Sequence, residues 1–422
     1  MAAAGVTAVE ADAGPTLDRI GTIQLIAMLA ATTMLSQFFR ASLAAIAPEL
    51  IRDLSLSARM LGLANGAFFI ALFVAQVFVG VFFDRIGVRR TVSTLALAMV
   101  AGSALHAVAW NGETFVLARL VVGLGSAASF MAALVLVSQW FPRAQWSTRL
   151  SWVFGLSQIG ILSAGSPLAL VTDAFGWRTA FWITTVLAAI TGILFRLLVR
   201  DRREVAREVV QGPSALEGLR MIVTLPGIVP VFVMFGIAYA ASFTVTGLWA
   251  GPYLKDVHGL DTAARGHVLT AIALMHAGGV LAFGPLDRVF NSRKWVVVAG
   301  AFATFATLVA LAAFPALPFW LGVGLLLTLA LVTNYNTVLL AHMRNHFPDH
   351  VAGRGATTGN MCQLAGAALL PIVTGFIPGM FAASATGGYA GDAYRLIFAV
   401  LAATLGLGIL VYLLSRDIRP RG

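Results

Sequence analysis

The chain has 422 residues, of which 59% are apolar and 11% charged, and its mean hydropathy is +0.88. Soluble globular domains carry about 25% charged residues, so this composition excludes that class and is typical of a polytopic membrane protein. The formal net charge is +10, and we expect the excess to face anionic lipid, without nucleic acid as a partner.

Twelve apolar stretches of about 20 or more residues follow one another along the chain, and each can cross a hydrocarbon core of about 30 Å as a helix. They lie at residues 21–47, 59–83, 91–110, 114–140, 150–172, 179–200, 227–251, 266–285, 295–313, 318–341, 356–382 and 393–415. The fold class predicted is therefore an all-α membrane protein of twelve transmembrane helices.

A long polar connection at residues 201–222 divides the twelve spans into six and six. We predict two six-helix bundles joined by a cytosolic linker. The bundles are expected at residues 19–200 and 223–416, with cytosolic tails at 1–18 and 417–422. The first tail has neither the basic n-region nor the short apolar h-region of a signal peptide, so it is not expected to be one. We expect it to be disordered.

Basic residues gather in the even-numbered connections and at both termini. By the positive-inside rule, we expect both termini to be cytoplasmic in a multi-pass protein of the plasma membrane. Arginine outnumbers lysine 26 to 2, which is typical of a GC-rich bacterial genome, so a bacterial inner membrane is expected. The chain contains a single cysteine, Cys362, so no internal disulfide and no thiolate metal cluster is expected.

Arg40 in the first span and Arg119 in the fourth lie inside apolar sequence, whereas every acidic residue falls in a loop, a terminus or a span end. A charge within a bilayer costs roughly 2.5 to 3.5 kcal/mol on insertion scales and indicates a functional site. Guanidinium groups suit carboxylates and phosphates. We predict that both arginines bind an anionic substrate; the alternative is that they bond backbone carbonyls.

The loop after the second span reads GVFFDRIGVRR from Gly80 to Arg90, and the loop after the eighth reads GPLDRVFNSRK from Gly284 to Lys294. Similar motifs at equivalent positions of the two halves indicate the internal repeats that are common in transporters. With R-x-x-x-G-x-G beginning at Arg119, these motifs resemble those of the major facilitator superfamily, and the resemblance covers essentially the whole chain.

The resemblance implies a secondary transporter whose loop after helix 2 stabilises the inside-closed state. That gating role falls on Gly80, Asp84, Arg85, Gly87 and Arg90 and, in the second copy, on Asp287 and Arg288. The second copy has Phe290 at the position of the second glycine.

Among subfamilies, SQFFRASLAAIAPEL in the first span resembles the organophosphate:phosphate antiporters and the anion:cation symporters. Acids that the symporters carry beside the helix 1 arginine and after the helix 4 arginine are replaced here by Phe39 and Ser126. The seventh span also lacks the arginine of the antiporters.

Uncharged polar residues recur on single faces of several spans, at the spacing of three and four that an α-helix requires. They are predicted to line the substrate cavity, although polar residues in lipid also join helices to one another. The predicted contacts besides the arginines are Ser36, Gln37, Tyr239, Thr246, Asn334, Asn336, Asn360 and Gln363.

His276 and His106 lie within spans, and either could carry a coupling proton because imidazole titrates near pH 6.5. The alternative is a structural role for each. His342, His346 and His350 have helical metal spacing, but Pro348 interrupts it, and we predict no metal site. No catalytic constellation or Walker-type loop is present.

The function predicted is therefore secondary active transport of a small organic anion, a carboxylate or phosphate ester, by alternating access. We expect a non-enzymatic monomer without a cofactor, with the lipid bilayer, the anion and a proton or counter-anion as partners. One alternative is an exporter of larger amphipathic molecules such as drugs or siderophores. Another is a transporter-like membrane sensor.

Overall fold

The computed structural model describes residues 17–420 except 202–223, 226, 315–316, 348–351, 383 and 385–387. Residues 202–222 of the predicted linker, His350 and residues 1–16 of the predicted N-terminal tail lie outside the described residues. The described chain is almost entirely helical and contains no strand. Eleven of its helical segments are long and apolar enough to cross a membrane, and α3, which packs against α4 and α8, completes the predicted twelve.

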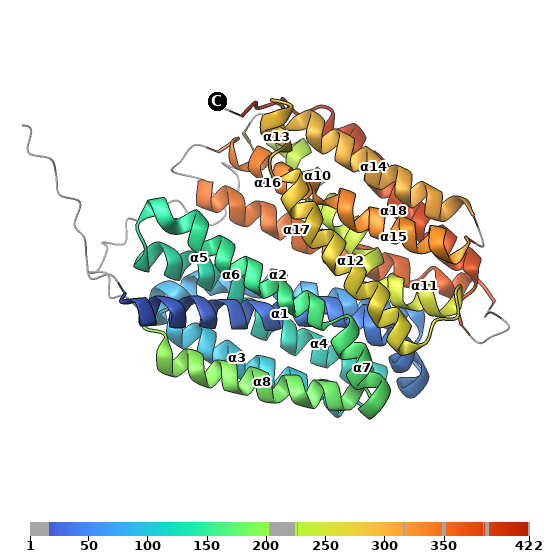
Figure 1. The fold of residues 1–422 in the computed structure, drawn as a ribbon, viewed down its shortest axis with the longest axis horizontal. Coiled ribbons are helices and arrows are strands. Elements are labelled where there is room, and N and C mark those ends of the chain that lie inside the picture. The colour runs from blue at the N-terminus through green and yellow to red at the C-terminus, as the bar shows by residue number, and fades with distance from the viewer. Residues whose placement is uncertain are drawn as a thin grey trace, which may run out of the picture.

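Helices α1 to α8 pack together as one bundle, which forms the lower half of Figure 1. Its helices are α1 (Arg19–Leu54), α2 (Ala58–Ile86), α3 (Val88–Ala107), α4 (Gly112–Ser126), α5 (Ser129–Trp140), α6 (Arg143–Ser163), α7 (Ser166–Phe175) and α8 (Trp177–Leu198).

Helices α10 to α18 form the second bundle. They are α10 (Ile228–Thr244), η1 (Val245–Trp249), α11 (Ala250–Asp256), α12 (Thr262–Phe283), α13 (Leu286–Val289), α14 (Lys294–Ala313), α15 (Phe319–Val332), η2 (Thr333–Tyr335), α16 (Asn336–Arg344), α17 (Ala352–Gly375), η3 (Pro378–Met380) and α18 (Gly391–Tyr412).

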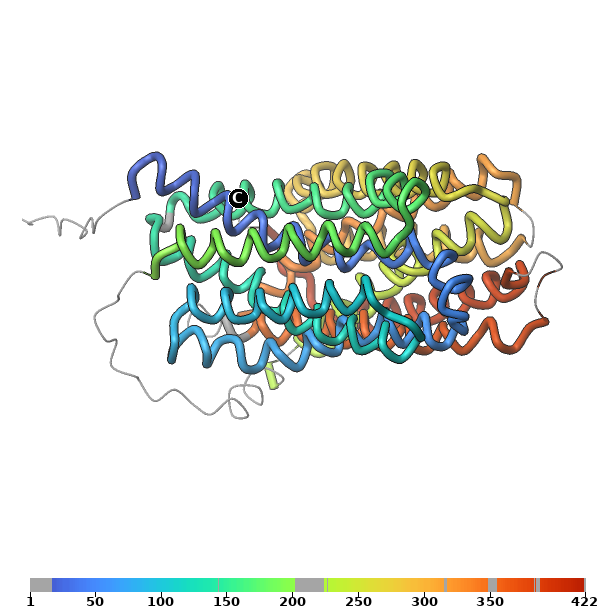
Figure 2. The backbone as a smooth tube through the Cα atoms, turned by 90° about the horizontal axis from the view of Figure 1, so that it is seen from below, coloured from blue at the N-terminus to red at the C-terminus, as the bar shows by residue number. Residues whose placement is uncertain are grey.

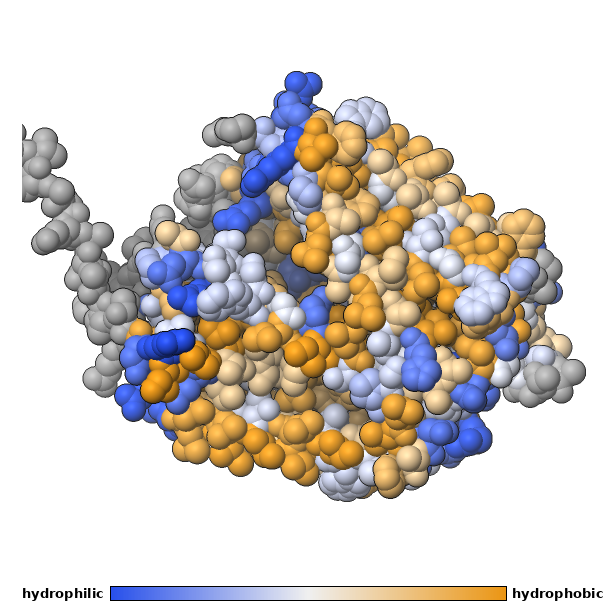
Figure 3. Space-filling view, viewed as in Figure 1, coloured by the Kyte–Doolittle hydropathy of each residue, from blue (hydrophilic) through white to orange (hydrophobic). Residues whose placement is uncertain are grey.

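The two ends of the molecule differ. The end where α1 begins and α8 and α18 finish, at the left of Figures 1 and 2, is called the linker end, and the opposite one the far end. The second bundle slopes toward the first and meets it at the far end, where α12 contacts α7 and α11 contacts α1, whereas α13 and α14 stand apart from the first bundle at the linker end. Apolar side chains cover most of the face in Figure 3, which is hollowed between the bundles.

The helix bounds differ from the predicted spans at several points. Helix α1 continues through Pro48 to Leu54, beyond the predicted end at residue 47. The fourth and fifth spans are each broken in two, at Ala127–Ala128 and at Ala164–Gly165. The seventh contains a π-helical turn at Val245–Trp249, and the tenth a 3₁₀ turn at Thr333–Tyr335. Hydropathy could not reveal these breaks, because all of these segments are apolar.

Acidic residues just past the last helix of each bundle hold the turns that begin α3 and α14. Asp201 Oδ1 accepts a hydrogen bond from the N–H of Arg89 (2.9 Å), and Asp417 Oδ1 accepts one from the N–H of Lys294 (3.0 Å). Anionic side chains at helix N-termini satisfy unpaired N–H groups and complement the helix dipole. The two halves therefore use equivalent carboxylates, in agreement with the repeated loops.

Replacing Asp417 with asparagine is expected to destabilise the protein by roughly 0.3 to 1 kcal/mol, the usual contribution of a negative charge at a helix N-terminus, because asparagine keeps an oxygen acceptor but loses the charge. Burial raises the pKa of Asp417, but hydrogen bonds from Ser292 and two backbone N–H groups outweigh burial and hold it below the ordinary 3.8. A lowered folded-state pKa gives stability that is present above pH 3.8 and is lost as the pH falls below it.

The thermal midpoint of the Asp417→Asn variant in detergent should therefore fall at pH 7, and its difference from the parent should shrink near pH 3. Asp173→Asn, which removes an exposed carboxylate near the C-terminal end of α7, is the control. An Asp417→Asn midpoint equal to that of the control at pH 7 would contradict the capping role.

Candidate functional site

A cavity of about 90 Å³ lies between the bundles, bounded by α1, α6, α10, α12 and α15. Three of the helix irregularities meet there. Its wall includes Ala164 and Gly165 at the break after α6, Thr246 and Gly247 in the π-helical turn, and Thr333 in the 3₁₀ turn. Helix irregularities of this kind occur frequently at functional sites. The irregular backbone and the cavity therefore indicate the same candidate site.

Arg40 is next to this cavity. Its neighbour Ala41 lines the wall, and its guanidinium interacts with the hydroxyl of Tyr239, another wall residue. Arg40 Cζ lies 5.7 Å from the centre of the Phe69 ring. Its Nε is buried without a hydrogen-bond partner, and no carboxylate in the described part of the chain forms an ion pair with it. Its charge is therefore not neutralised by any described residue.

Arg119 is placed differently. It is fully buried inside the first bundle, where Nη1 donates to the Phe39 carbonyl (2.7 Å) and Nε to the Ala64 carbonyl (3.2 Å). Its Cζ also lies 4.7 Å from the centre of the Phe68 ring. These contacts correspond to the alternative prediction of bonding to backbone carbonyls. Arg119 is not part of the cavity wall.

The predicted polar contacts fall into two groups. Tyr239 and Thr246 line the cavity. The others are not part of its wall. Gln37 donates to Gln158 (3.4 Å) and Asn360 to Gln76 (2.8 Å), while Ser36 is buried and Gln363 half-buried. Asn334 and Asn336 lie directly behind the wall, where they donate to the carbonyls of Ala330 (2.8 Å) and Thr333 (3.1 Å). The hydrogen bond from Asn360 to Gln76 joins α17 to α2 across the two bundles.

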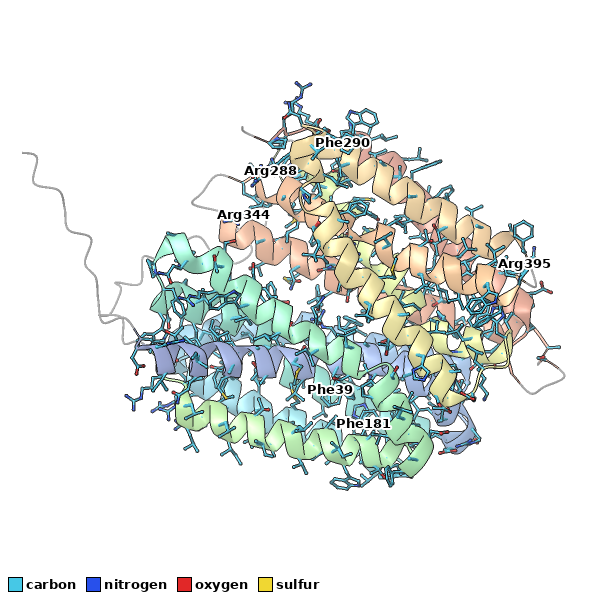
Figure 4. The ribbon with its side chains drawn as sticks, in the orientation of Figure 1. Phe39, Phe181, Arg288, Phe290, Arg344 and Arg395 are labelled. Atoms are coloured by element: carbon cyan, nitrogen blue, oxygen red, sulfur yellow. The ribbon has the colours of Figure 1, made fainter. Side chains whose placement is uncertain are left out.

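The two predicted proton carriers also separate. His276 lies in the cavity wall, with Nδ1 3.4 Å from the side-chain nitrogen of Asn334. His106 is fully buried in the first bundle, where Nδ1 contacts the Gly102 carbonyl (2.8 Å). Its ring stacks on Phe181 with centroids 4.7 Å apart, and Phe181 and Phe39 both point into the interior of that bundle in Figure 4. Only His276 is in contact with the cavity.

No group of three metal-ligating side chains occurs in the described chain. His342 Nδ1 lies 2.5 Å from the Tyr412 hydroxyl, and its Nε2 lies 2.9 Å from the Arg416 carbonyl. These contacts join α16 to α18 and occupy both ring nitrogens.

A buried ion pair at the far end is the main contact that sequence reasoning missed. Glu49 on α1 is bonded to Nη2 of Arg265 on α12, and their side chains are 10% and 2% exposed. Thr262 also donates to Glu49 (2.8 Å). The pair joins the two bundles. In the sequence, this contact could be suspected only from an acid that directly follows Pro48. The predicted first span ends near this proline, but helix α1 continues beyond it.

A second polar contact closes the far end between α7 and α12. The N–H of Ser166 donates to Thr270 Oγ1 (2.7 Å), and Ser166 Oγ lies 3.0 Å from His267 Nδ1. Close backbone approach accompanies it, because a Cβ on Gly251 would collide with the carbonyl of Ala44. The far end is therefore closed by hydrogen bonds, an ion pair and backbone packing together.

The predicted gating residues lie at the linker end. Asp84, Arg85 and Arg90 are exposed, and a Cβ on Gly80 would have no neighbour within 4 Å. Gly87 has a φ of 87° and packs against Asp201, so a residue without a side chain is required there. The first loop makes its turn with this glycine.

In the second copy of the loop, Asp287 is buried and accepts from Arg293 Nε (3.2 Å), whereas Arg288 is exposed. The residue with positive φ is Asn291 (47°), one position after Phe290. Asparagine tolerates that conformation better than most residues, so the turn is retained despite Phe290. Arg288, Phe290 and Arg344 lie together at this end of the second bundle in Figure 4.

We expect Asp84→Asn to favour the conformation seen here. Asp84 is exposed now, so its charge can stabilise only a state in which the linker end closes, and the shift is limited to that difference. Labelling of a cysteine at Ala41 in a Cys362→Ser background, with a reagent applied from the linker end, should become faster. Asp173→Asn, at the far end, is the control, and equal labelling in both variants would contradict the gating role.

Two helical bundles that meet at one end and separate at the other, with a cavity between them, define the architecture of a membrane transporter. The model of the Major Facilitator Superfamily matches residues 29–371, and the chain belongs to this family.

Among named relatives, a probable L-galactonate transporter of Escherichia coli K12 is 25% identical over 85% of this chain and 84% of its own length. A hexuronate transporter of Bacillus subtilis is 24% identical over 55% of this chain and 56% of its own. An inward-facing, occupied bacterial homologue of the human lysosomal transporter Spinster superposes with a TM-score of 0.80 at 16% identity, covering 94% of this chain and 97% of that one.

Proposed function

We propose that this protein moves a small organic anion across the membrane by alternating access, with Arg40 as the anion-binding group. The observation that carries the proposal is a half-buried guanidinium beside the inter-bundle cavity that has no carboxylate partner among the described residues. An ionisable side chain inside the membrane that faces a cavity and has no charged partner typically marks the pathway of a substrate or ion. The names of the probable L-galactonate transporter and of the hexuronate transporter both refer to carboxylates, and they support the same class of cargo.

Arg119 receives a supporting role in this proposal. Its hydrogen bonds to the carbonyls of Phe39 and Ala64 connect α4 to α1 and α2. Phe39 directly precedes Arg40, so these contacts hold the backbone from which the Arg40 side chain projects. Arg119 then positions the anion-binding group without itself touching the anion.

The basic residues of the linker end and the positive-inside rule support a cytoplasmic linker end. The conformation described here is then inward-facing, with the far end closed toward the outside. In the opposite state the contacts of the far end open, and the loops after the second and eighth spans come together at the linker end.

If transport is coupled to a proton, His276 is the candidate carrier, because it lines the cavity where the substrate would bind. Uptake that follows the protonated fraction of the cargo and survives His276→Gln would place the coupling proton on the substrate. Loss of pH-driven uptake with retained exchange in His276→Gln would place it on the histidine.

Counterflow into proteoliposomes tests the transport proposal. Liposomes loaded with one carboxylate at a time should accumulate the same carboxylate in labelled form, and the corresponding neutral amide should give no accumulation. Counterflow of neutral amphipathic molecules, with none of any carboxylate or phosphate ester, would support the exporter alternative and overturn this proposal.

A further inference from the structure

The cavity beside Arg40 has a mainly apolar wall. Ten of its fifteen lining residues have no polar group in the side chain: Ala41, Ile161, Ala164, Gly165, Phe243, Gly247, Leu269, Ile272, Ala273 and Ala330. The polar remainder is Tyr239, Ser242, Thr246, His276 and Thr333. A guest would therefore meet hydrocarbon over most of its surface.

Two of the five polar side chains use their hydroxyl protons on their own helix. Ser242 Oγ donates to the Tyr239 carbonyl (3.2 Å), and Thr246 Oγ1 donates to the Ser242 carbonyl (3.2 Å). Thr333 Oγ1, by contrast, is buried without a partner. The described wall groups that can donate to a ligand are thus few: the Tyr239 hydroxyl, Thr333, and the His276 ring, which also forms a hydrogen bond with the Ala330 backbone.

Aromatic rings connect the arginine to this apolar wall. Phe69, which lies next to Arg40, contacts Phe243 edge to face with centroids 5.3 Å apart. Phe243 in turn stacks on Tyr239 at 5.1 Å. A guest whose anionic group binds Arg40 would therefore place its body against the face or edge of these rings.

Resting on the proposed transport of an anion, we propose that the site selects a monocarboxylate with a compact apolar or aromatic body over a polyhydroxylated acid. Among the described residues, Arg40 is the one cation without an ion pair that adjoins the cavity, and Arg119 is bonded to backbone carbonyls elsewhere, so the charge matches one carboxylate. When a sugar acid enters the cavity, its hydroxyls lose their hydrogen bonds to water, and the wall offers too few hydrogen-bond partners to replace them. Burying unpaired polar groups is costly. An apolar body has no such requirement.

Three probes of related size separate this proposal from the one on which it rests. Benzoate has the charge and an apolar body, glucuronate has the charge and a hydroxylated body, and benzamide has the apolar body without the charge. Binding is measured by titration calorimetry on the purified full-length protein, and transport by counterflow. We expect benzoate to bind at least 10-fold tighter than either of the other two probes, because unmet hydroxyls and a lost charge interaction each cost about that factor or more.

Two isoleucines on α6 provide a matched pair of variants. Ile161 lines the cavity, whereas Ile159 is 47% exposed on the outer surface of the helix. Ile161→Thr introduces a hydroxyl into the wall and should weaken benzoate binding several-fold, while Ile159→Thr should leave it unchanged. Equal effects of the two changes would overturn the assignment of the apolar wall.

The probe outcomes are distinct. Glucuronate binding as tightly as benzoate, or tighter, would overturn the selectivity and leave anion transport in place. Benzamide binding as tightly as benzoate, or no binding of either carboxylate, would overturn the anion-binding role of the site and with it the proposed function.

Discussion

Replacing Arg40 with alanine is expected to reduce carboxylate counterflow roughly 100-fold, because loss of one partner from a desolvated charge pair costs on the order of 2 to 5 kcal/mol. Arg40→Lys should keep roughly a tenth of the activity, since lysine retains the charge but not the planar pair of donors that fits a carboxylate. The measurement is initial counterflow in proteoliposomes at equal protein density.

Two other arginines are the controls for this series. Arg52 lies on the same helix, and its side chain is 73% exposed, so Arg52→Ala should transport as the parent does. Arg119→Ala should instead lower the thermal midpoint, because the carbonyls of Phe39 and Ala64 lose their buried donor. Arg40 instead contacts the Tyr239 hydroxyl and the Phe69 ring, so Arg40→Ala should keep a midpoint closer to that of the parent than Arg119→Ala does.

Arg40→Ala and Arg119→Ala are thus expected to have different effects, the first on transport and the second on the thermal midpoint. Parental transport by a correctly folded Arg40→Ala protein would eliminate Arg40 as the anion-binding group. A lowered midpoint in Arg40→Ala together with a normal one in Arg119→Ala would mean that the two roles are exchanged.

The fold could be predicted because its main determinant is local. Helices that cross a bilayer need about 20 apolar residues, and the chain repeats that pattern between polar connections. The loop beginning at Gly80 and its echo at Gly284 predicted the repeat, and the equivalent caps at Asp201 and Asp417 agree with it. Arg40 could be recognised as a candidate because a lone charge in apolar sequence is rare.

The remaining features depend on neighbours that are distant in sequence. Arg40 and Arg119 look equivalent along the chain, and only packing of α4 against α1 and α2 shows that one is bonded to carbonyls. The apolar cavity residues, such as Leu269 and Ile272, cannot be distinguished in sequence from lipid-facing ones. Gly165 and Thr333 reach the cavity at the breaks in their spans. These breaks cannot be predicted from the hydropathy of the sequence.

The expectation that every acid belongs to a loop, a terminus or a span end also needs a refinement at Glu49. It lies past the predicted end of the first span, yet helix α1 continues for five further residues to Leu54 and the carboxylate is buried. Its partner, Arg265, lies in the other bundle. A carboxylate shared between two bundles that move relative to each other is suited to holding one conformation.

We expect Glu49→Gln and Arg265→Gln each to shift the population toward opening of the far end. In the present state the pair is almost completely buried, and removing one partner from a buried pair costs about 3 to 5 kcal/mol because the other charge is left unpaired. When the far end opens, water solvates both groups, so that cost falls mainly on the closed state. The double variant Glu49→Gln/Arg265→Gln should recover much of the closed population, because no buried charge is left unpaired.

Distances between spin labels at the far end measure this shift. Cysteines at Asp173 on α7 and Lys255 on α11, both exposed, report the separation of the bundles in a Cys362→Ser background. Arg395→Gln is the matched control, because Arg395 pairs with Asp392 at the same end but within α18 and with both side chains exposed, where an ion pair contributes little. Each single variant should add a longer distance to the distribution, the double variant should add less of it, and the control none. A distribution unchanged by Glu49→Gln or Arg265→Gln, or a double variant more open than either single one, would show that the pair does not hold the far end closed and would leave that role to the Ser166 contacts and the backbone packing at Gly251.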